Sequence, residues 1–263
     1  MLNTAKNKIH KTKIESDPFP YLFIRNLISK KDLNKLNKAL PNYNSIINKE
    51  VLYQSSSKSK KTILPNSKNY KVLNKNKEFK KINSFLKKLK PIIVKKFNKH
   101  INQHVKKKVF SSSLKYHSSY SVMKSGYKKS PHLDRRDHLI HMIFYPSSDP
   151  FKGGDICVHK LKKHKKNYDV FPEKKNLIIK KKYKVFNNSC IIILNVPWAY
   201  HSVTTYKSKK DRKYFYMVYD FPISNSGSKY KNRKAGFNQN QFWKNEVTIE
   251  STKRKRNFLT EKF

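Results

Sequence analysis

The stretch Cys190-Ile-Ile-Ile-Leu194, continued by Asn195-Val-Pro-Trp-Ala-Tyr-His201-Ser-Val203, decides the fold class. Its first part is an apolar run of strand length, and a turn with Pro and aromatic residues separates it from a second short β-type run. Many short strands with few helices between them are typical of a sandwich, a jelly roll or a barrel. Runs of this kind alternate with turns at 112–123, 138–145, 154–161, 176–186, 189–196, 199–206 and 213–221.

The N-terminal half has a different, mostly helical pattern. Asp17-Pro-Phe-Pro-Tyr-Leu-Phe-Ile24 predicts a first strand, and Ser29-Lys-Lys-Asp32 resembles a capping box that opens a helix ending at Pro41. Residues 42–70 are rich in Asn, Ser and Lys and are expected to form a loop. Apolar residues then recur at helical spacing and predict two further helices, with Pro91 in the first turn of the second. These residues are Phe79, Ile82, Phe85, Leu86 and Leu89, followed by Val94, Phe97, Ile101 and Val105.

The composition limits the class of protein. Lys and Arg number 61 and Asp and Glu 16, which gives a formal charge of +45, while 37% hydrophobic and 13% aromatic residues supply enough apolar surface for one core. Two Cys exclude a disulfide scaffold and a four-cysteine zinc site, and they indicate a reducing compartment. No run approaches the length of a membrane span or has the pattern of a signal peptide. We therefore expect a soluble, cytoplasmic protein.

The positive charge has two interpretations. A field of this size attracts polyanions such as nucleic acid, anionic membrane or acidic protein. Abundant Lys, Asn and Ile beside scarce Gly, Ala and Arg are also expected from an A+T-rich genome, although that bias does not explain the shortage of acids. The lysines are spread along the whole chain and not gathered in one motif. Nucleic-acid binding therefore stays an alternative function.

The sequence divides into four parts. Residues 1–16 are expected to be a basic mobile arm, and 17–110 a first strand with supporting helices. Residues 111–222 carry the strand-rich core. Residues 223–263 form a basic C-terminal extension that contains the cluster Lys253-Arg-Lys-Arg256, for which a solvated tail is the simplest interpretation.

The residues with chemistry lie in the strand-rich part. In Ser130-Pro-His132-Leu-Asp134, a strand would place His132 and Asp134 on one face, because side chains alternate with a period of two. His201 is the candidate for a third ligand. Two His and one carboxylate form a facial triad that leaves three positions of an octahedral Fe(II) open. A site made of His132, His138 and His141 is an alternative.

Two more features follow the His-x-Asp pair. Gly153-Gly154 makes a turn that opens an apolar strand, and Arg212 lies eleven residues beyond His201 at the start of another strand. An Arg at that place could point at the metal pocket and form a bidentate pair with a carboxylate. Arg135 and Arg136 could recognise an acidic substrate or lie in a solvated turn. Cys157 and Cys190 are expected in the core.

The order of these motifs resembles the iron(II)- and 2-oxoglutarate-dependent dioxygenases, in the branch similar to prolyl 4-hydroxylases. The resemblance covers residues 17–222 and is strongest over 118–221. It implies that His132, Asp134 and His201 are the iron ligands, and that Arg212 and Tyr145 bind the distal carboxylate of 2-oxoglutarate. Tyr145 ends the strand Leu139-Ile-His-Met-Ile-Phe-Tyr145.

The resemblance also implies a fold and a reaction. The fold is mainly β with flanking α-helices, a double-stranded β-helix of the jelly-roll or cupin-like kind. The cofactors are Fe(II), 2-oxoglutarate and O2, and an unactivated C–H bond is hydroxylated with release of succinate and CO2. The sequence departs from the family at Met123, where a Tyr is usual, and either Tyr120 or Tyr127 could take that role. The substrate stays open, with a slight preference for an anionic one.

Two other functions are alternatives. A cupin-like isomerase or a halogenase could use the same roll, but a halogenase needs the carboxylate position vacated, and Asp134 argues against that. The second is a non-catalytic protein that binds polyanions on an oxygenase-derived fold. Turnover of 2-oxoglutarate separates the oxygenase from the binding protein.

Overall fold

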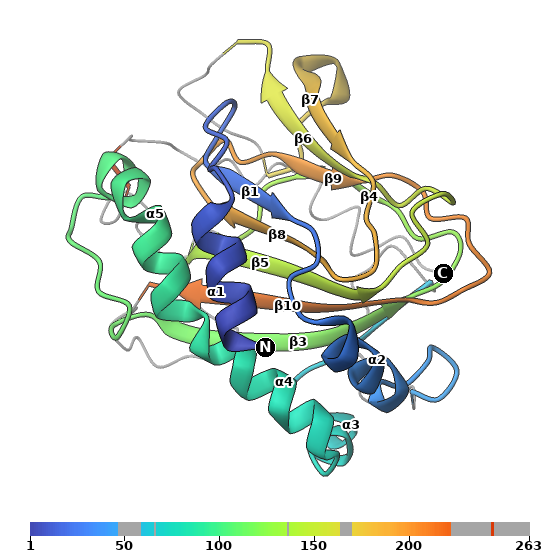
Figure 1. The fold of residues 1–263 in the computed structure, drawn as a ribbon. Helices are drawn as coiled ribbons and strands as arrows, with labels where there is room; N and C mark the ends of the chain where they lie inside the picture. The colour runs from blue at the N-terminus through green and yellow to red at the C-terminus, as the bar shows by residue number, and fades with distance from the viewer. Residues whose placement is uncertain (47–58, 66, 136, 164–169, 222–242, 245–263) are drawn as a thin grey trace.

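The structure is a computed structural model that describes residues 1–46, 59–65, 67–135, 137–163, 170–221 and 243–244. Two antiparallel sheets face each other (Figure 1). The larger has the strand order β1-β8-β5-β10-β3-β2, and the smaller has the order β4-β9-β6-β7. The strands are β1 Tyr21–Ile24, β2 Lys60–Ile63, β3 Lys115–Met123, β4 Lys129–His132, β5 His138–Ser147, β6 Ile156–Leu161, β7 Leu177–Tyr183, β8 Ser189–Leu194, β9 His201–Val203 and β10 Arg212–Asp220.

The path of the chain between the sheets defines the fold. From β3 to β6 successive strands alternate between the larger and the smaller sheet, and β8, β9 and β10 alternate again after the β6–β7 hairpin. Strands that wind between two facing antiparallel sheets form a jelly roll. The expected double-stranded β-helix, mainly β with flanking helices, is therefore confirmed.

Helices cover the outer face of the larger sheet. Phe79 of α4 lies with its ring centroid 5.9 Å from that of Phe215 in β10 and 6.4 Å from that of Tyr120 in β3. Side chains of a strand alternate between faces, so the neighbours of Phe215 in β10 point toward the smaller sheet. The helices are α1 Leu2–Lys11, α2 Lys30–Ala39, α3 Lys68–Leu73, α4 Lys77–Lys88 and α5 Lys90–His104, with a 3-10 turn at Lys174–Asn176.

Most of the predicted elements are present. Ser29 caps α2 by accepting a hydrogen bond from the Asp32 amide, and the helix gives way to extended backbone at Leu40, just before Pro41. Pro91 lies in the first turn of α5, and the first strand and all seven predicted β-type runs contain a strand. Among the described residues, no helix is long and apolar enough to cross a membrane.

Two segments differ from the expectation. Residues 2–11, expected to belong to a mobile arm, form α1, and Ala5 and Ile9 are fully buried because their spacing of four places both on one helical face. Within the expected loop 42–70 lie β2, which pairs with β3, and the short helix α3. Part of that loop, 47–58, lies outside the described residues.

The C-terminal extension is described only at 243–244. Trp243 is buried there, with its ring centroid 5.5 Å from that of Phe221, and it bridges to Val105. The extension therefore returns to the core at this point. The basic cluster 253–256 lies outside the described residues.

Candidate metal centre

Three ligating side chains meet between the two sheets. His132 ends β4 and His201 begins β9, and the two residues are direct partners in the antiparallel pairing of these strands. Asp134 lies two residues beyond the end of β4, so it reaches the histidines from a loop. The expectation that one strand carries both His132 and Asp134 on the same face is therefore wrong. The three residues come together because the chain turns back after His132.

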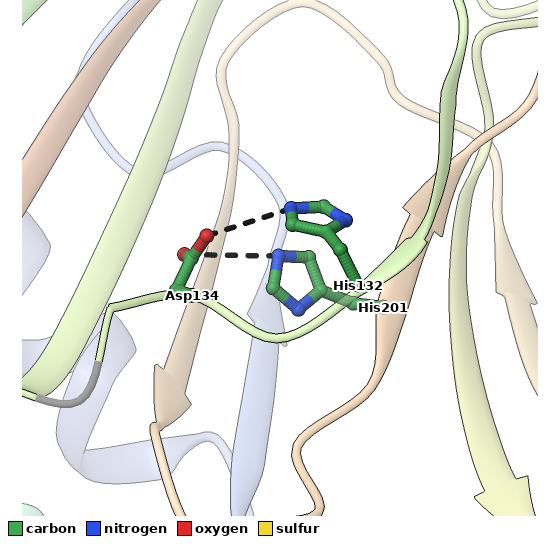
Figure 2. A group of neighbouring side chains, drawn as sticks. All are labelled: His132, Asp134 and His201. Atoms are coloured by element: carbon green, nitrogen blue, oxygen red, sulfur yellow. Dashed lines mark ion pairs between the residues drawn. The ribbon is translucent and has the colours of Figure 1, made fainter. Parts of the chain in front are cut away.

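The geometry is compact (Figure 2). The Nε2 atom of His132 lies 3.4 Å from Oδ1 of Asp134, and Nε2 of His201 lies 3.8 Å from Oδ2 of the same carboxylate. The ligand atoms of all three residues lie within 4.8 Å of one another. Both histidines are buried and the aspartate is half-buried. One small ion could therefore touch all three side chains.

Backbone carbonyls fix the tautomer of each histidine. Nδ1 of His132 lies 2.9 Å from the carbonyl oxygen of Ser130, and Nδ1 of His201 lies 3.0 Å from that of Ala199. A carbonyl can only accept, so each Nδ1 carries the hydrogen, and each Nε2 has a free lone pair when the ring is neutral. Metal-binding histidines are commonly held in this way.

The electrostatics favour a cation at this point. Burial, followed by the neighbouring His201, lowers the pKa of His132 to about 4, so the ring is neutral near pH 7. Two nitrogen lone pairs and a carboxylate then face one another, and such a group is stabilised by a positive charge between them. A divalent ion that prefers two imidazoles and one carboxylate fits these residues.

Two side chains of the larger sheet lie against the carboxylate of Asp134. The Tyr216 hydroxyl donates a 2.9 Å hydrogen bond to Oδ2 of Asp134, and Nδ1 of His141 lies 3.2 Å from the same oxygen. Burial opposes ionisation of Asp134, but the imidazole of His141 and those of the other two histidines lower its pKa well below its usual value. The sequence interpretation missed Tyr216, although its place on the inner face of β10 follows from the period of two.

Arg212 is fully buried at the start of β10. Its guanidinium donates hydrogen bonds to the carbonyls of Gly153, at 3.0 Å, and Gly154, and it lies 4.3 Å above the ring of Tyr206. Arg212 shares the inner face of β10 with Tyr216, four residues or about 13 Å along the strand. The guanidinium forms no ion pair with a carboxylate of the described residues.

The two glycines explain how Arg212 fits. Gly153 and Gly154 have φ angles of +73° and +72°, which other residues rarely adopt. A Cβ at Gly154 would collide with the Arg212 guanidinium, and a Cβ at Gly153 would collide with the carbonyl of Thr205. Glycine is therefore required at both positions by the positive φ angles, and at Gly154 also by the close approach of Arg212.

Tyr145 lies beside Arg212 as the sequence interpretation supposed. The Arg212 guanidinium carbon is 5.8 Å from the Tyr145 ring centre, and the ring is buried. Either Tyr120 or Tyr127 was expected to take the role of the tyrosine that is usual at the position of Met123. The Tyr120 hydroxyl donates a hydrogen bond to the Pro41 carbonyl, on the helix side of the sheet. Tyr127 lies instead near Lys60, whose ammonium is 5.8 Å from its ring. The Tyr120 hydroxyl is thus already engaged on the helix side of the sheet.

Other candidates have structural contacts. His138 belongs to a second buried group, in which its Nδ1 lies 2.5 Å from Asp220 and Arg135 binds Asp137. The alternative site of His132, His138 and His141 is therefore not formed. His159 is also buried, and its Nε2 lies 2.7 Å from the Ser202 hydroxyl.

The remaining polar and sulfur groups pack or hold turns. The side-chain amide of Asn195 donates to the carbonyls of Arg135 and His138, so it fixes the loop that follows Asp134. The Trp198 indole donates to the Pro18 carbonyl at 3.0 Å. Cys157 and Cys190 are free and buried, as expected.

No family model matches the chain, and no curated protein matches it. Solved structures similar to it are 2-oxoglutarate- and Fe(II)-dependent oxygenases, mostly prolyl 4-hydroxylases. A Pseudomonas putida prolyl 4-hydroxylase has 10% identity and a TM-score of 0.47, with 84% of this chain and 99% of that chain covered. A Trichoplax adhaerens prolyl hydroxylase, solved with a hypoxia-inducible-factor peptide, has 11% identity and a TM-score of 0.49 over 83% and 88% of the two chains. The viral collagen prolyl hydroxylase of Paramecium Bursaria Chlorella virus-1, solved with 2-oxoglutarate, has 13% identity and a TM-score of 0.39 over 76% and 95%. In fold, the chain is similar to these oxygenases.

Proposed function

We propose that the protein is an Fe(II)- and 2-oxoglutarate-dependent dioxygenase that hydroxylates an unactivated C–H bond. The observation that carries this proposal is the convergence of two imidazole Nε2 atoms and one carboxylate within 4.8 Å. Both histidines are fixed in the tautomer that offers Nε2 to a metal. Three protein ligands on one side of the ion leave the other side for small molecules.

His132, Asp134 and His201 would hold the metal, which, with 2-oxoglutarate and O2, supplies oxidation of a C–H bond as 2-oxoglutarate is converted to succinate and CO2. The chain's own part is to position and to exclude water. Tyr216 donates to Asp134 and keeps that carboxylate turned toward the histidines. Burial by the surrounding strands lowers the pKa of His132 and so keeps that imidazole neutral and ready to bind the ion.

Arg212 and Tyr145 would bind the distal carboxylate of 2-oxoglutarate. The guanidinium is buried, its Nε has no hydrogen-bond partner among the described residues, and it forms no ion pair with a described carboxylate. A buried cation of this kind is unfavourable until an anion pairs with it. Burial lowers the pKa of Arg212, because removal from water disfavours the charged guanidinium.

The test is whether the protein consumes 2-oxoglutarate. Purified protein given Fe(II), 2-oxoglutarate, ascorbate and air should form succinate and CO2 in equal amounts, and His201→Ala should form neither. Folding of that variant is checked by circular dichroism. If the folded wild-type protein forms no succinate but binds nucleic acid with a steep salt dependence, it is the non-catalytic polyanion-binding protein instead.

We propose, further, an anionic substrate, because a net charge of +45 raises the local concentration of anions. Succinate release above the substrate-free rate provides the readout. A panel of acidic peptides, phosphorylated sugars and nucleotides should stimulate it more than neutral analogues of the same compounds. Equal stimulation by the neutral analogues would contradict this preference.

A further inference from the structure

A pocket of about 340 Å³ lies at the opposite end of β5 from the metal centre. Three loops form it, following β1, following β5 and preceding β8. His141, beside the metal ligands, is separated from Ser148 in the pocket by seven residues of mostly extended chain, or roughly 23 Å. The pocket is therefore remote from the metal ligands, although Tyr145 lies only three residues before Ser148. It is lined by Arg25, Asn26, Ser148, Pro150, Phe186 and Asn187.

The walls of the pocket are fixed to the sheet. The buried side chain of Asn188 accepts from the Ile28 amide at 3.0 Å and donates to the Ile28 carbonyl at 2.7 Å. Its own backbone amide donates to the Tyr145 carbonyl at 2.7 Å, and the Asn187 side chain accepts from the Ser148 amide at 2.6 Å. These bonds join the three loops, so the pocket is largely preformed, as ligand sites usually are.

A cation and an aromatic ring, Arg25 and Phe186, line the pocket, and a second such pair adjoins them. The Arg25 guanidinium lies 4.4 Å above the Phe186 ring, and the Lys184 ammonium lies 5.4 Å from the ring of Phe151. The rings of Phe151 and Phe186 are 6.4 Å apart, and Phe151 is 74% exposed. Neither cation forms an ion pair with a carboxylate of the described residues.

A buried hydroxyl also lines the pocket without a partner. Ser148 is only 9% exposed, and its Oγ makes no hydrogen bond within the described part of the chain. A buried polar atom of this kind costs free energy unless a ligand or water satisfies it. The amide side chains of Asn26 and Asn187 line the same pocket and can donate and accept.

We propose that this pocket is a second, non-catalytic site that binds a nucleotide. An exposed ring such as Phe151 offers a face on which a base stacks, and Arg25 and Lys184 offer charges for the phosphate. The Ser148 hydroxyl and the two amides can bind the polar edge of the base. The same chemistry is presented by a free nucleotide and by single-stranded nucleic acid. The net charge of +45 favours either.

The experiment measures binding of a short fluorescein-labelled oligothymidylate to the full chain by fluorescence anisotropy. The double variant Arg25→Gln with Phe151→Ala should raise Kd about 10-fold through loss of stacking and one phosphate contact. The matched control is Lys108→Gln with Phe110→Ala, which removes a similar pair 5.2 Å apart elsewhere, with Phe110 56% exposed. The control should change Kd by less than about 2-fold, because only general charge is lost.

Competition identifies the source of the ligand. Displacement of the probe by adenosine monophosphate indicates a free nucleotide, whereas displacement by unlabelled single strands alone indicates nucleic acid. The proposal is overturned if both double variants weaken binding equally, or if the pocket variant binds as the wild type does. If the double variant does not fold, the Kd of the single variant Phe151→Ala is compared with that of the wild type instead, because this side chain is exposed and its loss should not affect folding.

Discussion

Tyr216 decides how the Asp134 carboxylate is turned. Its hydroxyl donates to Oδ2 at 2.9 Å, and burial, together with the charge of Asp134, raises its pKa well above the usual value, so the proton stays on the tyrosine. Tyr216→Phe removes this donor and little volume. We expect the Kd of the metal-free protein for Mn(II), measured by electron paramagnetic resonance, to rise about 10-fold.

Tyr219→Phe is the control for that change. Tyr219 lies on the same strand, on the opposite face, and its buried hydroxyl has no hydrogen-bond partner among the described residues. Its loss should leave the Kd for Mn(II) within about 2-fold of wild type, since it touches no ligand. Equal effects of the two substitutions would show that Tyr216 does not act on Asp134.

Arg212 is the residue on which we propose that binding of 2-oxoglutarate depends. Arg212→Lys keeps the positive charge but removes the planar guanidinium, whose two terminal nitrogens donate hydrogen bonds to the carbonyls of Gly153 and Gly154. We expect the Kd for 2-oxoglutarate, measured by calorimetry with Mn(II) in place of iron, to rise about 10-fold or more. The Kd for Mn(II) alone should not change, and a parallel loss of both affinities would assign Arg212 a purely structural role.

At this scale the sequence predicted which residues come together better than it predicted their geometry. His132, Asp134 and His201 are recognisable by residue type and order, and the structure brings them together. The expectation that a strand carries both His132 and Asp134 was wrong, because the chain leaves β4 after His132. His141 approaches Asp134 from a strand of the other sheet, and such a contact depends on how the sheets face each other.

Helix α1 is the element that departs most from the sequence prediction. Residues 1–16 are mostly polar and basic, and in this composition the short apolar stripe of Ala5 and Ile9, both fully buried, was overlooked. Helices α2, α4 and α5 were predictable because their stripes are longer and a cap or proline marks their start. Strand β2 was missed because only pairing with β3 makes a Lys-rich segment a strand.

The contribution of α1 to stability can be measured. Ile9→Ala removes a fully buried side chain and should lower the free energy of unfolding in urea by about 2–3 kcal/mol. Lys6→Ala, on the exposed face of the same helix, should change it by less than about 0.5 kcal/mol. An unaltered unfolding curve for Ile9→Ala would mean that residues 1–16 are the mobile arm that the sequence suggested.

At the scale of the molecule, buried histidines make stability depend on acid. Burial lowers the pKa of His132 and His159 to about 4 and that of His141 to about 3, against an ordinary value of 6.5. Below pH 6.5 these histidines bind protons in the unfolded chain but stay neutral in the folded chain. The free energy of unfolding therefore falls as the pH falls toward 4. We expect the metal-free protein to lose several kcal/mol of unfolding free energy over this window.

Urea unfolding at a series of pH values checks this expectation. His141→Leu removes one of the three groups and should make the decline less steep between pH 6.5 and about 4. A stability that is constant, or that rises, as the pH is lowered through this window would show that these imidazoles are not held neutral by the fold.

The fold class was predictable from the sequence because short apolar runs and turns alternate along 111–222. The pocket beyond β5 was not, since Arg25, Ser148 and Phe186 come from three loops far apart in the chain. Loop positions follow from hydrogen bonds such as those of Asn188, and these depend on the finished sheet. Residues that share a strand face can be inferred from spacing, whereas residues that share a pocket between loops require the structure.

The most direct test of the proposed metal centre is an anaerobic titration with Fe(II) and 2-oxoglutarate, followed by visible absorption. The wild-type protein should develop a metal-to-ligand charge-transfer band that saturates with each component. His201→Ala, which removes one of the three ligands, should develop none. A folded wild-type protein that shows no band with both components present would contradict the account of this site as an iron and 2-oxoglutarate centre.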